Sequence, residues 1–319
     1  MSRISPGLLF LILTLSRSIS AGSWITLAPV LEARQEVAVA TAGGKIYLIG
    51  GIGNGRVLTS VEQYDPVTNQ WRFVSPIPQP LHHSAAVAIG ESIYLIGGYR
   101  TLAFDPTDAV YRYDIGSDRW QSVARLPSPR GAHAAAAIEG KVYVVGGVPG
   151  GNQLTVYDPL TYRWAALAPM PTPREHLAAV AVAGQLFAIS GRLQGNVSAF
   201  ESYDPMLNRW RTLAPIPTSR SGIAAAAVGE RIYVFGGEGN TRASTGVFAE
   251  TESYSVSSGR WSTETPMLTP RHGIGAAAIG DVIYIPAGAA VQGFGTSATH
   301  EAFITPAAPR RRAARKGGL

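Results

Sequence analysis

Six tryptophans, Trp24, Trp71, Trp120, Trp164, Trp210 and Trp261, set a repeating frame along this chain. Each is followed 26 residues later by a diglycine or its counterpart, which begins at Gly50, Gly97, Gly146, Ser190, Gly236 and Ala287. A tyrosine stands seven residues before each of the last five tryptophans, at 64, 113, 157, 203 and 254. The length variation therefore falls between the diglycine and the tyrosine. A fixed frame of 44–51 residues with one variable segment is typical of stacked supersecondary units, and diglycine with Trp favours propeller blades.

Each unit divides into four strand-like pieces. The first is rich in alanine, as in 133–138, which suits a crowded innermost strand. The second carries β-branched and aromatic residues, as in 45–51, and a glycine-containing hairpin such as Gly229-Glu230 joins the two. The third ends at a Tyr-Asp-Pro step, where proline stops the ladder, and Trp opens the fourth. The composition, with 36 Gly and 22 Pro, fits many short strands joined by turns.

The last unit lacks its own outer strand. Seven residues after Phe303, where the frame requires a tryptophan, the chain has Arg310. The missing strand is available one unit out of phase, as Trp24 to Leu27. We therefore predict an all-β fold, a six-bladed β-propeller of four-stranded blades, in which this amino-terminal strand completes the last blade and hides both open edges.

The diglycine after a hydrophobic strand, the Tyr-to-Trp spacing and the Pro-Arg step between units resemble Kelch repeats over residues 23–306. Departures are Ser190 and Ala287 for the first glycine and Leu81 for the arginine. The resemblance implies a Kelch propeller and leaves function open. Galactose-oxidase-like copper chemistry is excluded because the chain has no cysteine for the cross-linked cofactor. Exported six-bladed Kelch proteins that mutarotate sialic acid are similar in size to this chain. For them, an Arg and a Glu at the mouth would bind the carboxylate and move a proton.

Charge and hydropathy predict three segments. Residues 1–22, with Arg3, an apolar run and small residues near Gly22, are laid out like a signal peptide; the propeller follows over 23–306, and 307–319 form a basic disordered tail. Of the net charge of +6, residues 310–316 carry five positive charges and Arg3 and Arg17 two more, which leaves −1 for the remainder. A nucleic-acid-binding stripe on the propeller is not supported.

Candidate binding residues lie at the steps between units. In a meander the connections after strands two and four emerge on one face, so the variable segments share a face with these steps. Arginine occupies five of six equivalent step positions: Arg34, Arg130, Arg174, Arg220 and Arg271. This pattern has two interpretations, a structural role repeated in each blade or a cationic ring that binds carboxylates.

Polar residues that occur in only some units are the better functional candidates. Glu36, His83 and His176 stand two residues after the step position and should point the same way, and Glu175 adjoins them. Their spacing in the sequence does not show that these side chains converge as metal ligands must, so we expect no metal and no cofactor.

These observations predict an exported, secreted or periplasmic binding module. It would act as a monomer and recognise a protein, peptide or glycan, including acidic ones, through its loop face. We expect it not to bind nucleic acid and to have no transmembrane segment once the leader is removed. We expect it not to be an enzyme. The alternative is a sialic-acid-type carbohydrate mutarotase or epimerase, with Arg174 or Arg220 and Glu175 or Glu36 in the catalytic roles.

Overall fold

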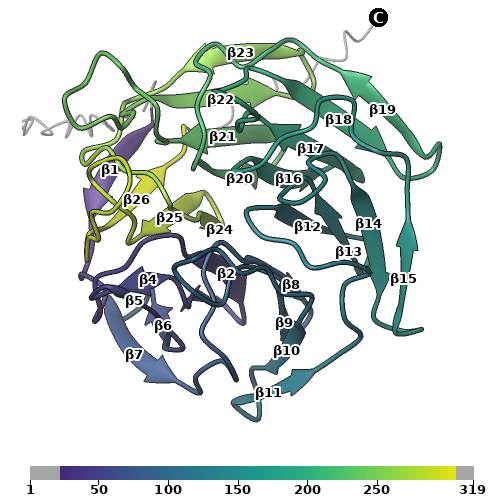
Figure 1. Cartoon of the computed structure of the whole chain (residues 1–319). Coiled ribbons are helices and arrows are strands. Elements are labelled where there is room, and N and C mark those ends of the chain that lie inside the picture. The colour runs from purple at the N-terminus through teal and green to yellow at the C-terminus, as the bar shows by residue number, and fades with distance from the viewer. Residues whose placement is uncertain (1–21, 307–319) are drawn as a thin grey trace, which may run out of the picture.

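A computed structural model describes residues 22–306, which form six four-stranded antiparallel sheets around a central axis (Figure 1). The predicted leader, apart from Gly22, and the predicted tail lie outside the described residues. Each sheet is one blade, and its strands are given from the axis outward: blade one has β2 (Ala38–Ala42), β3 (Lys45–Ile49), β6 (Val61–Asp65) and β7 (Gln70–Val74), and blade two has β8 (Ala85–Ile89), β9 (Ser92–Ile96), β10 (Val110–Asp114) and β11 (Arg119–Ser122). Blade three has β12 (Ala134–Ile138), β13 (Lys141–Val145), β14 (Leu154–Asp158) and β15 (Arg163–Ala166), and blade four has β16 (Ala178–Val182), β17 (Gln185–Ile189), β18 (Phe200–Asp204) and β19 (Arg209–Thr212). Blade five has β20 (Ala224–Val228), β21 (Arg231–Phe235), β22 (Thr251–Ser255) and β23 (Arg260–Thr263), and blade six has β24 (Ala277–Ile279), β25 (Val282–Pro286), β26 (His300–Ile304) and β1 (Ser23–Thr26).

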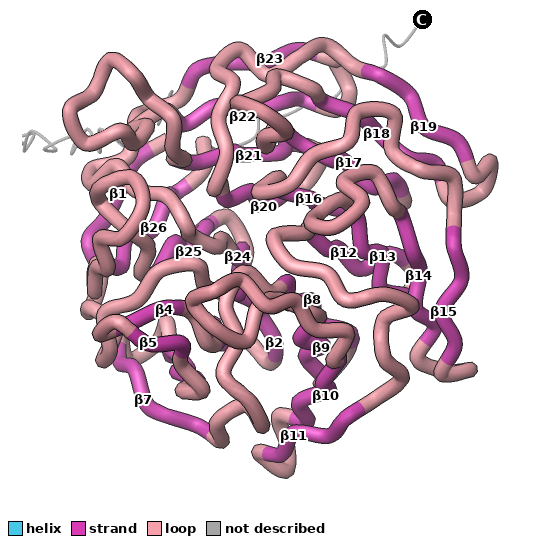
Figure 2. The backbone as a smooth tube through the Cα atoms, viewed as in Figure 1, coloured by secondary structure: helices cyan, strands magenta, loops and turns pink. Residues whose placement is uncertain are grey.

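Strands and loops account for all of the described chain (Figure 2). A short hairpin, β4 (Ile52–Gly53) with β5 (Arg56–Val57), decorates the variable segment of blade one. Residues 22–306 contain no helix that is long and apolar enough to cross a membrane.

The predicted closure is confirmed. Strand β1 pairs antiparallel with β26, with Trp24 opposite Phe303 and Thr26 opposite Glu301, so the two ends of the described chain complete one sheet (Figure 1). The Trp24 ring packs 5.2 Å from Phe303 and 5.6 Å from Phe235 of blade five. The amino-terminal strand therefore holds blade six to blade five.

Tryptophan also links the blades at the outer rim. Each indole Nε1 donates a hydrogen bond of 2.8–3.0 Å to the carbonyl of the residue four positions after the preceding tryptophan in the ring. The first of these bonds, from Trp24 to Thr265, closes the circle. Within blades one to five the ring packs on the tyrosine of the third strand, with centroids 5.0 Å apart for Tyr157 and Trp164.

The diglycines make a second circle of links nearer the axis. The second glycine donates its N–H to the carbonyl at the step position of the next blade, as in Gly98 to Arg130, at 2.8–3.0 Å in all six blades. In the four blades that have glycine at the first position there is little room for a side chain: a Cβ on Gly236 would lie 2.2 Å from the carbonyl oxygen of Arg271. Ser190 and Ala287 take this position in the other two blades. The repeat of the sequence is therefore a repeat of contacts between neighbouring blades.

Replacing Trp24 with alanine should destabilise the protein. The change removes a partly buried, packed ring and one circle-closing hydrogen bond; truncating a fully buried aromatic ring costs roughly 3–5 kcal/mol, which is the upper limit of the loss here. Denaturant unfolding would measure the loss. Ile25→Ala, on the same strand but 39% exposed, is the control and should change little. An unfolding midpoint for Trp24→Ala equal to that of the control would contradict the closure.

Candidate functional site

The steps between blades and the variable segments meet on one face of the propeller, as predicted. The residue after each step position forms a β-bridge with the residue that follows the diglycine of the same blade, for example His82 with Tyr99 and Glu175 with Arg192. Six such bridges surround the axis. We call this side the loop face.

A closed ring of backbone hydrogen bonds lies at the centre of the loop face. It is formed by the residue two positions after each step position, which we call the axial position: Glu36, His83, Ala132, His176, Gly222 and Gly273. Each amide donates to the carbonyl of the axial residue in the preceding blade, at 2.8–3.1 Å. All six have φ between 50° and 63°, a region that L-residues rarely occupy. Glycine suits this ring best, so each axial side chain adds strain.

The five step arginines, predicted above as ligand-binding residues, are buried inside the blades rather than exposed on the loop face. Arg34, Arg130, Arg174, Arg220 and Arg271 are at most 1% exposed. Their guanidinium groups donate to carbonyls of their own blade, as Arg174 does to Ser190 and Ala188. Four of them also pair with a buried glutamate of the third strand, Arg174 with Glu201 at 2.6 Å. Their donors face the blade interior, which favours the structural interpretation over the cationic ring.

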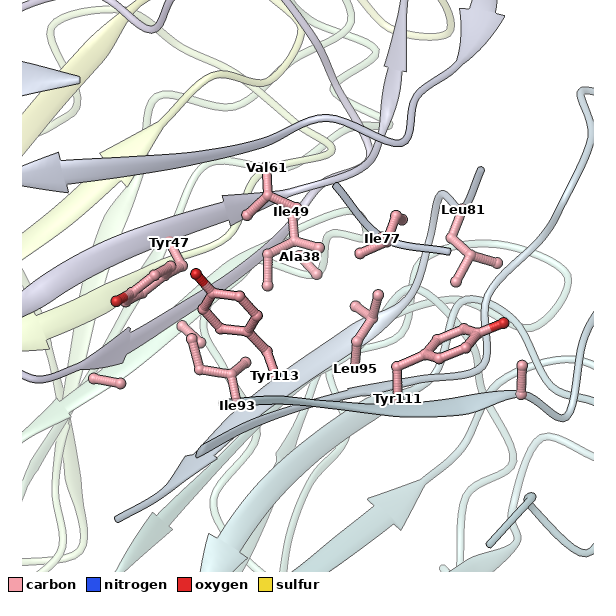
Figure 3. Close-up of a cluster of buried hydrophobic side chains, with 13 residues drawn as sticks. Ala38, Tyr47, Ile49, Val61, Ile77, Leu81, Ile93, Leu95, Tyr111 and Tyr113 are labelled. Atoms are coloured by element: carbon pink, nitrogen blue, oxygen red, sulfur yellow. The ribbon is translucent and has the colours of Figure 1, made fainter. Parts of the chain in front are cut away.

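The exceptions among the blades support this interpretation. Blade two has Leu81 at the step and Tyr111 in place of the glutamate, and both lie in one apolar cluster between blades one and two (Figure 3). Blade three has Arg130 but Thr155 in the glutamate position. Within the described residues Arg130 has no carboxylate partner; it donates to Gln153 at 2.7 Å, and burial lowers its pKa to about 10. Blade two thus lacks both members of the pair, whereas blade three keeps the buried arginine on neutral acceptors.

Three of the predicted site residues do converge at the axis. Ligand atoms of Glu36, His83 and His176 all lie within 4.8 Å of one another, and His83 Nε2 is 3.1 Å from a Glu36 carboxylate oxygen. The side chains are only 6–10% exposed. Glu175, also predicted, accepts a 2.5 Å hydrogen bond from His176 Nδ1. The role of these four residues in binding stays a prediction.

Four further residues complete what we call the mouth cluster: His82, Arg192, Glu238 and His272. Arg192 pairs with Glu175 at 2.6 Å and with Glu238 at 2.5 Å, which joins blades four and five. His272 Nδ1 lies 3.5 Å from Glu238 and 3.6 Å from Glu36. None of these four residues is among those predicted above for the site. For Arg192 and Glu238 the signal that could have found them is their offset, two residues after the start of the diglycine, because that position pairs with the residue after the step.

Burial shapes the ionisation of the mouth cluster. Removal from water raises the pKa of Glu36 and lowers that of His83 well below its usual value. Burial would also raise the pKa of Glu175, but its contacts with His176 and Arg192 outweigh this and lower it. Three carboxyl groups face one guanidinium, so the mouth is rich in acceptors.

The mouth cluster opens into a cavity of about 220 Å³, which is smaller than the pockets of most drug-sized ligands. Phe104 and Phe294 from two variable segments line it beside His83 and Glu238. Around it, the variable segments carry six exposed apolar side chains, which we call the apolar rim: Leu102, Phe104, Val148, Leu193, Val291 and Phe294. A polar, half-enclosed centre is therefore surrounded by apolar contacts.

Comparison with known proteins agrees with this architecture. A family model described as the KLHDC2/KLHL20/DRC7 Kelch-repeats domain matches residues 20–147 and 75–237, and a Kelch motif model matches 219–268. The chain belongs to the Kelch-repeat family. Kelch propellers are typically protein-binding modules.

Its relatives match over short segments. Kelch-like protein 35 of Mus musculus is 36% identical over 95 residues, 29% of this chain and 17% of the relative. An F-box/kelch-repeat protein of Arabidopsis thaliana is 38% identical over 77 residues, 24% of this chain and 20% of the relative. The chain thus spans a fifth or less of the length of these curated relatives. The solved structure of YjhT superposes with a TM-score of 0.73 at 16% identity over 86% of this chain and 95% of that one, which shows a shared fold.

Changing Arg220 to alanine should lower stability. It leaves Glu252, which is 3% exposed, as an unpaired buried carboxylate, and breaking a buried pair costs about 3–5 kcal/mol. Thermal and denaturant unfolding would measure this loss. Arg125→Ala, which removes a guanidinium 73% exposed, is the control and should melt like the unmodified protein. If Arg220→Ala melted like the control, the structural role would be wrong.

Proposed function

We propose that this Kelch propeller is an exported binding module whose loop face recognises a protein or peptide. The observation that carries the proposal is the apolar rim around the mouth cluster. Phe294 is 68% and Leu193 60% exposed, and both lie on variable segments rather than on the repeated frame. Exposed aromatic and aliphatic side chains around a buried polar centre are the arrangement in which partner side chains find anchors.

The position of the rim favours a protein or peptide as the ligand over a small-molecule substrate bound inside the cavity. The cavity of about 220 Å³ admits one side chain or a comparable group, whereas the rim offers contacts over several blades. Polar groups at the centre would set specificity, because a partner that leaves them unpaired loses hydrogen bonds.

The charge of the mouth changes the expected ligand. Since the step arginines are buried, the acidic partner expected from them loses its support. The only guanidinium that we assign to the mouth, Arg192, is already paired with Glu175 and Glu238. Three carboxyl groups favour a cationic or hydrogen-bond-donating group of the partner.

The apolar rim can be tested with a double variant, Phe104→Ser with Phe294→Ser. Peptides selected against the unmodified protein should bind this variant tenfold or more weakly, because aromatic anchors of about 2 kcal/mol dominate interfaces. Titration calorimetry would measure the affinities. Leu160→Ser with Met206→Ser, two exposed side chains on the turns between third and fourth strands, is the matched control.

Equal losses in both double variants would contradict recognition by the loop face. Selection of glycans but no peptides from parallel arrays would contradict the choice of a protein or peptide. Faster exchange of sialic-acid anomers in the presence of the protein, seen by NMR, would favour the mutarotase alternative. That alternative has less support, because Arg174 and Arg220 are buried and Arg192 is paired.

Export rests on the leader-like residues 1–22. We expect the mature protein to begin between residues 21 and 23, outside the cytosol. Sequencing of the amino terminus of protein recovered from the cell envelope or medium would check this. An intact Met1 on cytosolic protein would overturn export and leave the binding proposal untouched.

A further inference from the structure

The axial residues and their neighbours form a set of hydrogen-bond acceptors without matching donors. His82 Nε2 lies 3.0 Å from the carbonyl of Thr101, which can only accept, so this nitrogen carries the proton. The neutral His82 then accepts at Nδ1, where His83 Nδ1 lies 2.6 Å away and donates. His83 Nε2 is therefore left with a lone pair, and it faces a Glu36 oxygen at 3.1 Å.

His272 is fixed in the same manner. Its Nε2 donates to the carbonyl of Val291 at 3.0 Å, which leaves Nδ1 of the neutral ring with a lone pair. That nitrogen is buried, has no hydrogen-bond partner among residues 22–306, and lies 3.6 Å and 3.5 Å from the carboxylates of Glu36 and Glu238. The side chain is 1% exposed. A buried lone pair between two acidic groups gives this side of the mouth surroundings that favour a cation.

His176 offers a third lone pair. Its Nδ1 donates to Glu175 at 2.5 Å, and Nε2 is left free. Arg192 Nη2 lies 3.2 Å from Nε2 and 3.3 Å from Nδ1, and near-equal distances to both nitrogens place the guanidinium off the direction of the Nε2 lone pair. A histidine held by a carboxylate through one nitrogen, with the other free, is the usual arrangement of a metal ligand.

We propose that the mouth binds one divalent transition-metal ion of the zinc class through Glu36, His83 and His176, whose ligand atoms all lie within 4.8 Å of one another, with His272 beside the site. Two ligands of a tetrahedral ion, each about 2.0–2.2 Å from it, lie roughly 3.4 Å apart. His83 Nε2 and Glu36 Oε2 are 3.1 Å apart, close to this value, and the ligand atom of His176 lies within 4.8 Å of both. Imidazole with carboxylate suits zinc and its neighbours in the periodic table better than magnesium or calcium.

The charges agree with this assignment. Glu36, Glu175 and Glu238 face Arg192, so with neutral histidines and ionised carboxylates the mouth carries a charge of −2, which a divalent ion balances. The three ligands come from blades one, two and four. The ion would thus hold together three blades at the centre of the ring, on side chains that glycine or alanine replaces in the other axial positions.

The test is metal binding by the full chain, purified without a histidine tag. After treatment with a chelator, titration with ZnCl2 should show one ion per chain and a higher melting temperature, and Co²⁺ should give visible absorption typical of four-coordinate nitrogen and oxygen ligands. His83→Gln with His176→Gln should weaken binding by about 100-fold or more, and His82→Gln, which removes only the orienting hydrogen bond, by about tenfold. His300→Gln, a buried histidine of blade six outside the cluster, should bind like the unmodified protein.

A folded, unmodified protein that takes up neither ion stoichiometrically would overturn the proposal, as would unchanged binding by the His83/His176 variant. If that variant fails to fold, the Co²⁺ spectrum of the unmodified protein decides, because ligation by water alone gives only the weak absorption of an octahedral ion. Peptide selection on metal-free protein keeps the result separate from the proposed function.

Discussion

The contact on which this propeller depends is the hydrogen bond from the second glycine of each blade to the step carbonyl of the next. Six such bonds of 2.8–3.0 Å fix how neighbouring sheets sit against each other. A Cβ on the first glycine would meet that same carbonyl at 2.2 Å in blade five and 2.4 Å in blade one. The diglycine, the 26-residue spacing from tryptophan and the step residue are therefore parts of one inter-blade contact, and the tryptophan bonds repeat it at the rim.

This contact also positions the site. Once the step carbonyl is held by the preceding blade and the step arginine by its own, the two residues that follow are directed to the axis. The first pairs with the variable segment, and the second enters the axial ring. The protein can therefore vary side chains at these two positions without altering the frame. Glu36, His83 and His176 occupy the axial positions of blades one, two and four, and Glu175 and His272 the positions beside the ring.

The repeat made most of the fold predictable. Trp24 out of phase with Phe303 predicted the closing strand, and the elastic spacing between diglycine and tyrosine predicted which segments form the loop face. The direction of the arginine side chains could not be read in this way, because a repeated arginine fits a buried ion pair and a surface ring equally well. The glutamates that decide the matter, such as Glu201, stand two residues before the framework tyrosines, and their pairing across about 27 residues appears only in three dimensions.

The mouth cluster, like the arginine pairs, could not be predicted from the sequence alone. Glu36 and His176 are 140 positions apart in sequence, and only the sixfold arrangement brings their ligand atoms within 4.8 Å. Their backbone φ values of 55° and 50° cost roughly 1–2 kcal/mol each relative to glycine, which the ring accepts at Gly222 and Gly273. A frame that tolerates glycine there does not need these side chains for folding. The proposed metal site would explain why the chain keeps ligating side chains at Glu36 and His176 although glycine fits the ring without strain.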